Sequence, residues 1–281
     1  MEFITDPRDM MAWSATARRH ARAIGFVPTM GALHTGHLDL LERAKTTCGS
    51  VVCSIFVNPL QFNDPKDLEG YPRQLERDRE LLEQAGCDVL FAPDKAGVFV
   101  DHTVTEFDLG GLDRNWEGPS RPGHFQGVAN VVERLFFHVR PEKAFFGEKD
   151  RQQLAIIRHV ARACLWPEEI VACPTIRNAH GLALSSRNQR LSDGQREAAT
   201  VLYRTLRHVA SLAFRTDVQA THEAAAAVLA SEPSVVLDHF GIAHPDTLEP
   251  LKDWGDLDHA VALIAAQVGP VRLIDNITLL R

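Results

Sequence analysis

The feature that most constrains this chain is a glycine loop between a predicted strand and a predicted helix. The apolar run at residues 23–27 is typical of a buried strand, which we expect to end at Pro28. The loop then reads Met30-Gly31-Ala32-Leu33-His34-Thr35-Gly36-His37, and the apolar periodicity of residues 38–44 predicts a helix. Free backbone N–H groups and the positive helix end make the start of such a helix a binding site for anions.

Two histidines make this loop a candidate nucleotide site. His34 and His37 add side-chain donors for phosphate oxygens, and Gly31 and Gly36 let the backbone approach a ligand closely. The alternative is an ordinary strand–loop–helix connection whose histidines are structural. We favour the nucleotide site because the histidines flank a glycine where the helix begins.

The composition excludes several classes of function. A net charge of −7 argues against a nucleic-acid partner, which would need a basic surface. The first residues are acidic, so we expect no signal peptide, and no apolar run is long enough to span a membrane. The five scattered cysteines predict reduced thiols in a cytoplasmic protein, not a disulfide frame or a zinc site. We expect Cys53, Cys87 and Cys173 to be buried in apolar runs.

The order of the predicted elements indicates two domains. Strands alternate with helices up to residue 176, which predicts an α/β domain with a doubly wound, Rossmann-like parallel sheet. A short β pattern lies at residues 103–107, and the Glu and Arg residues of a helix predicted at 72–85 should mostly face solvent. Residues 177–281 predict a smaller α+β domain, because two Ala-rich helices precede three strand-like runs without crossover helices.

Three other places carry residues suited to an anionic substrate, and each has a structural alternative. Asn58 and Gln61 follow a strand's carboxyl end, where open α/β sheets bind ligands, although the run could be an ordinary polar turn. Lys149 stands between a strand and a helix, a position that by itself favours a surface lysine. The Ser185-Ser186-Arg187 run suits a phosphate clamp but could instead cap the following helix.

Motifs along nearly the whole chain resemble those of the pantothenate synthetase (pantoate–β-alanine ligase) family. They are Val27 to His37, Phe56-Val57-Asn58-Pro59-x-Gln61-Phe62, Tyr71-Pro72-Arg73, Arg121-Pro122-Gly123-His124-Phe125-x-Gly127-Val128, Phe146-Gly147-x-Lys149-Asp150-x-Gln152-Gln153-Leu154, Gly181-Leu182-Ala183-x-Ser185-Ser186-Arg187-Asn188 and Arg272-Leu273-Ile274-Asp275-Asn276. The first is shared with the wider H-x-G-H nucleotidyltransferase superfamily. The runs around Gln61, His124 and Gln153 are together specific.

The resemblance implies an ATP-dependent ligase that condenses (R)-pantoate with β-alanine. Pantoate's carboxylate would attack the α-phosphorus of ATP, giving pantoyl adenylate and pyrophosphate, and the amine of β-alanine would then displace AMP. Mg²⁺ would arrive on the phosphates of ATP, with no dedicated metal site on the protein. The resemblance also implies a cytoplasmic homodimer in which the second domain acts as a lid.

The resemblance also implies the role of each site residue. His37, His34 and Lys149 would be catalytic. Gln61 and Gln153 would bind pantoate, and Asn58 would lie near β-alanine. The ATP site would comprise Met30, Gly31, Ala32, Leu33, His34, Thr35, Gly36, His37, Gly147, Glu148, Lys149, Asp150, Ile176, Leu184, Ser185, Ser186 and Arg187.

The chain departs from the family pattern before the Gly181 run. The family usually reads Arg-Glu-x-Asp-Gly where this chain has Arg177-Asn178-Ala179-His180-Gly181, and Leu184 replaces a frequent Met.

One rival hypothesis for the function is a nucleotidyltransferase acting on a phosphate-bearing substrate, which the neutral Gln61 and Gln153 disfavour. The other is a binding protein that has lost catalysis, which the intact histidine, lysine, serine and arginine set disfavours.

Overall fold

The computed structural model describes residues 1–63 and 65–281 and divides into two compact units. The N-terminal unit comprises Met1–Asp113, Gly118–Glu148 and Gln153–Pro174. The C-terminal unit comprises Arg114–Glu117, Lys149–Gln152 and Thr175–Arg281. Two short segments from the first part of the sequence therefore group with the last hundred or so residues.

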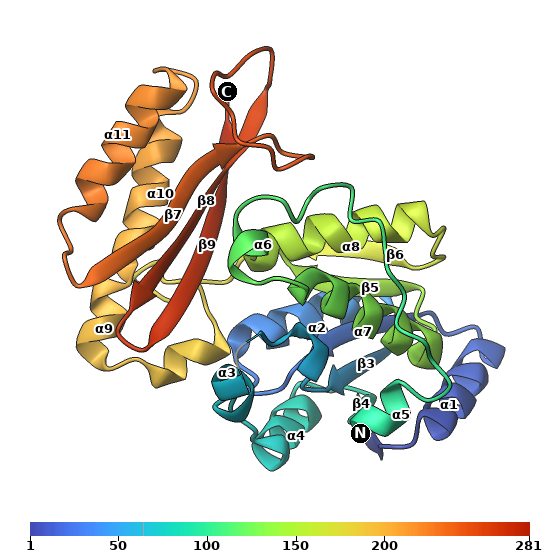
Figure 1. The fold of residues 1–281 in the computed structure, drawn as a ribbon. Helices are drawn as coiled ribbons and strands as arrows, with labels where there is room; N and C mark the ends of the chain where they lie inside the picture. Colours follow the sequence, from blue (N-terminus) through green and yellow to red (C-terminus); the bar gives the residue numbers. More distant parts are fainter. Residues whose placement is uncertain (64) are drawn as a thin grey trace. The chain divides into compact units, whose positions relative to one another are not determined.

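A six-stranded parallel sheet forms the centre of the N-terminal unit, with the order β1-β4-β3-β2-β5-β6 (Figure 1). The strands are β1 (Glu2–Ile4), β2 (Ile24–Thr29), β3 (Ser50–Ile55), β4 (Val89–Phe91), β5 (Lys143–Gly147) and β6 (Glu169–Cys173). The strand pairings in this sheet are parallel, which confirms the predicted α/β fold.

Helices cover both faces of this sheet. The longer ones are α1 (Pro7–Arg19), α2 (Thr35–Thr47), α4 (Leu75–Gln84), α7 (His124–Val139) and α8 (Arg151–Ala163), and the short ones are α3 (Pro65–Glu69), α5 (Lys95–Val98) and α6 (Glu117–Ser120). Successive strand residues alternate between the faces: Phe26 packs with α1 and α7, whereas Val27 packs with α2 and α4. Both faces are buried, as the continuous apolar runs of the strands predict.

Pro28 lies inside β2, so the predicted strand end was wrong. β2 pairs with β3 as far as Thr29, but its pairing with β5 stops at Phe26. Beyond Phe26 the strand has a neighbour on one side only. A proline, which lacks the N–H group, is tolerated at such a position.

Residues 103–107, which carry a short β pattern, form no strand, because side chains of α7 take the place of a neighbouring strand. Asn130 accepts from the N–H of Thr105 and donates to its carbonyl, at 2.8 Å in both cases. Gln126 does the same for Phe107, at 3.1 and 2.7 Å. The backbone groups are thereby satisfied without a sheet partner.

Three cysteines are buried, as predicted. Cys53 and Cys87 lie on one face of the sheet, and Cys173 ends β6. Burial raises the pKa of the Cys87 thiol to about 12 and that of the Cys173 thiol to about 11. Both thiols are therefore protonated at neutral pH and serve as small apolar side chains.

The C-terminal unit is an antiparallel sheet of three strands with helices on one face, which confirms the predicted α+β architecture. Its elements are α9 (Asp193–Ala198), α10 (Thr200–Leu212), α11 (Val218–Leu229), β7 (Val235–Ala243), β8 (His259–Val268) and β9 (Val271–Leu280). Trp116 packs on Ala243, Val261 and Leu263, apart from the helix-covered core. In the described part of the chain, every helix is too short or too polar to cross a membrane.

Candidate active site

The glycine loop lies at the topological switch point of the parallel sheet. The chain runs from β2 through β3 to β4 on one side, and β5 and β6 lie on the other side of β2. In open α/β sheets, ligands bind beside the carboxyl ends of the strands where the order reverses. The loop after β2 occupies this place.

The two histidines cap helix α2 reciprocally. His34 is the N-cap residue, and its Nδ1 accepts from the N–H of Gly36 at 3.1 Å. The N–H of His34 in turn donates to Nδ1 of His37 at 3.3 Å, and the ring centroids are 4.1 Å apart. Because a backbone N–H only donates, each Nδ1 is an acceptor, so the neutral rings carry their hydrogen on Nε2. The structural and the functional interpretations are therefore compatible: Nδ1 caps the helix and Nε2–H remains a donor.

The loop backbone is held from both sides. Gly31 and Ala32 have φ values of +81° and +50°, in the left-handed region. The hydroxyl of Thr29 accepts from the N–H of Gly31 at 3.1 Å and donates to the carbonyl of Ser54. Asp78 of α4 accepts from the N–H groups of Ala32 and Leu33, at 2.8 Å each.

Gln61 lies against the glycine loop. Its Nε2 contacts Sδ of Met30 at 3.1 Å, which links the segment after β3 to the segment after β2. Asn58 is 1% exposed and caps the 3₁₀ helix η1 (Pro59–Gln61). Its amide donates to Oε1 of Gln61 at 3.2 Å and to the carbonyl of Gly127 at 3.0 Å. Asn58 therefore fixes the orientation of the Gln61 side chain.

The start of α7 supports the same segment. Nδ1 of His124 donates to the carbonyl of Gln61 at 2.7 Å. Gly127 lets α7 pack against η1, because a Cβ atom there would lie 2.3 Å from the carbonyl oxygen of Leu60. The Arg-Pro-Gly-His-Phe motif, which had no role by sequence alone, thus supports the backbone of Gln61 through His124.

We expect Gly127→Ala to lower the free energy of unfolding of the N-terminal unit by about 1–3 kcal/mol, because the methyl group forces α7 away from η1. Denaturant titration measures this change. Gly194→Ala is the matched control, since no atom lies within 4 Å of the added Cβ. Equal stability of the two variants would show that α7 and η1 do not need this close approach.

The segment after β5 carries the other predicted residues of the N-terminal unit. Gly147 ends β5, and no atom lies within 4 Å of the position of its missing Cβ. Glu148 follows in the short turn η2 (Glu148–Asp150). Gln153 lies half-buried in the first turn of α8. Because β5 neighbours β2, these residues follow the carboxyl end of the adjacent strand.

In the C-terminal unit, strand β9 holds the backbone of Lys149. Nδ2 of Asn276 donates to the carbonyl of Lys149 at 2.9 Å. The Lys149 side chain is 17% exposed, and its Nζ lies 3.6 Å from a carboxylate oxygen of Asp150. The Arg-Leu-Ile-Asp-Asn motif of the sequence therefore includes the residue that anchors the candidate catalytic lysine.

The neighbouring Asp275 of β9 anchors a second predicted segment. Its carboxylate accepts two hydrogen bonds from Arg177, at 2.5 and 2.8 Å, and the guanidinium lies 4.0 Å from the ring centroid of Tyr203. Next to it, Oδ1 of Asn178 accepts from the N–H groups of His180 and Leu182, at 3.0 and 2.9 Å. The side chain of Asn178, a residue that departs from the family pattern, thus stabilises the turn at residues 178–182 by its own hydrogen bonds.

The serine segment forms a short helix of its own. The N–H of Leu184 donates to the carbonyl of Ile176 at 2.9 Å. Ser185 caps the 3₁₀ helix η3 (Ser186–Arg190) by accepting from the N–H of Arg187, and Ser186 is buried. Helix α9 is capped by Ser192, so these serines do not serve as its cap.

The candidate residues thus form two sets. The N-terminal unit holds the loop from Met30 to His37 together with Asn58, Gln61, Gly147, Glu148 and Gln153. The C-terminal unit holds Lys149, Asp150, Ile176, Leu184, Ser185, Ser186 and Arg187. Contacts within the first set join Met30, Asn58 and Gln61. That both sets serve one ligand stays a prediction.

Comparison with known proteins decides the family. A model of the family described as pantoate-beta-alanine ligase matches residues 2–278. The chain belongs to the pantoate–β-alanine ligase family. A pantothenate synthetase of Porphyromonas gingivalis is 44% identical over 277 residues, which cover 99% of each chain.

Solved structures of the family have the same fold. The pantothenate synthetase of Thermus thermophilus matches with a TM-score of 0.93 and 44% identity, over 100% of both chains. The pantoate-β-alanine ligase of Francisella tularensis matches with a TM-score of 0.81 and 33% identity, over 99% of this chain and 97% of that one. The latter was crystallised with βγ ATP and β-alanine.

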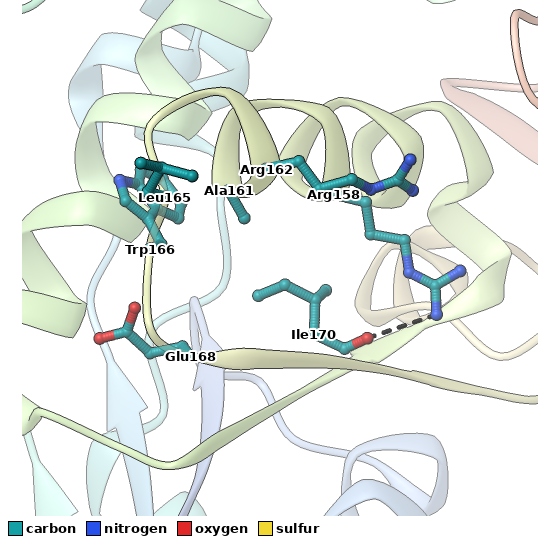
Figure 2. Close-up of a pocket in the computed structure, with 7 residues that line it drawn as sticks. All are labelled: Arg158, Ala161, Arg162, Leu165, Trp166, Glu168 and Ile170. Atoms are coloured by element: carbon teal, nitrogen blue, oxygen red, sulfur yellow. Dashed lines mark hydrogen bonds between the residues drawn. The ribbon is translucent and has the colours of Figure 1, made fainter.

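An open hollow of about 400 Å³ lies elsewhere on the N-terminal unit (Figure 2). It is lined by Arg158, Ala161, Arg162, Leu165, Trp166, Glu168 and Ile170. Ile170 pairs with Ala144 near the amino end of the edge strand β6, whereas the glycine loop follows the carboxyl end of β2. The predicted site residues are absent from the described lining, so this hollow is not the candidate active site.

Four residues that support the candidate site had no assigned role in the sequence. His124, Gly127 and Asn276 lie in family motifs, and that membership was the available signal. Asp78 had no such signal, because the Glu and Arg residues around it indicated a solvent-facing helix surface. The structure buries Asp78, which is 1% exposed.

Proposed function

We propose that this chain is an AMP-forming ligase that condenses (R)-pantoate with β-alanine, with ATP as the second substrate of the first step. The observation that carries the proposal is the contact of Gln61 with Met30 at the switch point of the sheet. It places a neutral amide against the loop that leads to His34 and His37 at the start of α2. A nucleotide phosphate suits the histidines, and the carboxylate and hydroxyl groups of pantoate suit the amide.

In the first step, a carboxylate oxygen of pantoate attacks the α-phosphorus of ATP. The new O–P bond forms as the bond to pyrophosphate breaks, so negative charge builds on the leaving group. His34 and His37 would donate to phosphate oxygens, and Lys149 would neutralise the leaving pyrophosphate together with Ser185, Ser186 and Arg187. Mg²⁺ would enter bound to the phosphates of ATP. This chemistry depends on positioning and on charge stabilisation.

In the second step, the amine of β-alanine attacks the acyl carbon of the adenylate. The C–N bond forms, AMP leaves with the electron pair of the C–O bond, and the amine loses a proton. Gln61 and Gln153 would hold pantoate through both steps, and Asn58 would lie near β-alanine. The hydrogen bonds of Asn58 to Gln61 and Gly127 support an orienting role for it.

Release of pyrophosphate and AMP tests this proposal. With ATP and Mg²⁺, pantoate alone should give pyrophosphate in near-stoichiometric amount. Sustained AMP release should require β-alanine as well. Pyrophosphate release that needs a phosphate-bearing acceptor would support a nucleotidyltransferase, and no release with any combination would support a binding protein.

We also infer three finer properties from the family resemblance. The chain would form a homodimer through its N-terminal unit, which sedimentation measurements can check. The C-terminal unit would act as a lid, because the mixed anhydride must be kept from water. The enzyme would be cytoplasmic, in keeping with the free cysteines of the structure.

A further inference from the structure

A buried carboxylate fixes the backbone of the glycine loop. Asp78 lies on α4 and is 1% exposed. Its Oδ2 accepts from the N–H of Ala32 and its Oδ1 from the N–H of Leu33, at 2.8 Å each. Both carboxylate oxygens are thus used on the two residues immediately before His34, the N-cap of α2.

The loop needs such a support because its backbone is strained. Ala32 has a φ of +50°, in the left-handed region that a residue with a Cβ atom disfavours. Gly31, at +81°, is also closely packed, since a Cβ there would lie 3.0 Å from Oδ2 of Asp78. Two charge-assisted hydrogen bonds hold this conformation in place.

Burial of this carboxylate disfavours its ionised form. Burial raises the pKa of Asp78, and the N–H groups of Leu33 and Ala32 and the nearby Arg77 lower it only in part. A carboxyl pKa raised by folding means that stability falls as pH rises from the unfolded pKa through the folded one.

We propose that Asp78 is a positioning residue for the adenylate-forming step. By holding the N–H groups of Ala32 and Leu33, it fixes the direction in which the chain enters His34. The reciprocal cap then fixes the ring of His37, and with it both Nε2–H donors. This role rests on the proposed function, and it adds to that function a residue that does not touch the substrates.

Asp78→Asn tests the role, because the amide retains the shape but presents a donor to one of the two N–H groups. We expect pyrophosphate formation in a single turnover to slow by about 10- to 100-fold. Attack of β-alanine on supplied pantoyl adenylate should change much less. Glu80→Gln is the matched control: it removes the same charge from an exposed position on the same helix and should leave both rates unchanged.

Hydrogen exchange of residues 30–37 without substrates gives a readout independent of activity. Loss of one bond should speed exchange of the Ala32 and Leu33 amides by about 5- to 10-fold. Equal slowing of both half-reactions, or unchanged loop exchange, would overturn the role. If Asp78→Asn does not fold, Asp78→Ser is judged by the same criteria. If the wild type releases no pyrophosphate, the proposed function fails, and exchange alone decides whether Asp78 holds the loop.

Discussion

Lys149→Ala should slow pyrophosphate release by about 10²–10³-fold, the usual cost of removing one donor to developing charge. The pyrophosphate leaving group gains negative charge as the O–P bond breaks, and Lys149 is the lysine proposed to neutralise it. We expect the melting temperature to stay within a few degrees, because an ion pair such as that of Nζ with Asp150, at 3.6 Å, contributes little to stability. The anchor to Asn276 uses the backbone carbonyl, which the substitution retains.

Lys252→Ala is the control for Lys149→Ala. It removes the same charge from an exposed position in the same unit and should leave the rate unchanged. Lys149→Arg keeps the positive charge but spreads it over a planar guanidinium, so we expect a partial loss of the rate of pyrophosphate release. Near-normal single-turnover rates in Lys149→Ala would remove Lys149 from the mechanism without affecting the assignment of the family.

His37→Gln should cause a loss of similar size, about 10²–10³-fold, while α2 keeps its cap. Glutamine is a usual third residue of a capping box, so its side chain can accept from the N–H of His34. The imidazole Nε2–H donor of His37 is lost. We expect the free energy of unfolding to change by less than about 1 kcal/mol, and parallel kinetics and denaturant titration measure both effects.

The control for His37→Gln disrupts a cap away from the loop. Ser192 and Gln195 form the same kind of reciprocal box at the start of α9. Gln195→Ala should cost about 0.5–1 kcal/mol of stability and leave the rate unchanged. A large loss of stability with little loss of rate in His37→Gln would mean that His37 only caps the helix.

The parts predicted well from the sequence are those encoded within one short window. The run from residue 23 to residue 44 contains a strand, a glycine loop and a helix start in succession, and hydrophobic periodicity identifies each of them locally. The same holds for the strand predicted at residues 50–57, of which β3 covers Ser50–Ile55. The parallel sheet follows because strands alternate with helices.

The structure departs from the local pattern where a distant segment of the chain decides the outcome. Residues 103–107 have a β pattern, but Asn130 and Gln126 of α7 bond their backbone instead of a strand. Pro28 was expected to end β2, but the pairing with β5 had already stopped at Phe26. Neither the α7 side chains nor the extent of pairing with β5 can be identified from the residues adjacent in the sequence.

The sequence by itself determined the family, the fold class and the candidate donors, because periodicity and motifs are local properties of the chain. Only the tertiary structure decided how those donors are held. Asp78 reaches Ala32 across 46 residues, and Asn276 reaches Lys149 across 127. Such contacts depend on how the sheets and helices bring distant segments together, so a charged residue on α4 is buried beneath a loop although its neighbours in sequence face solvent.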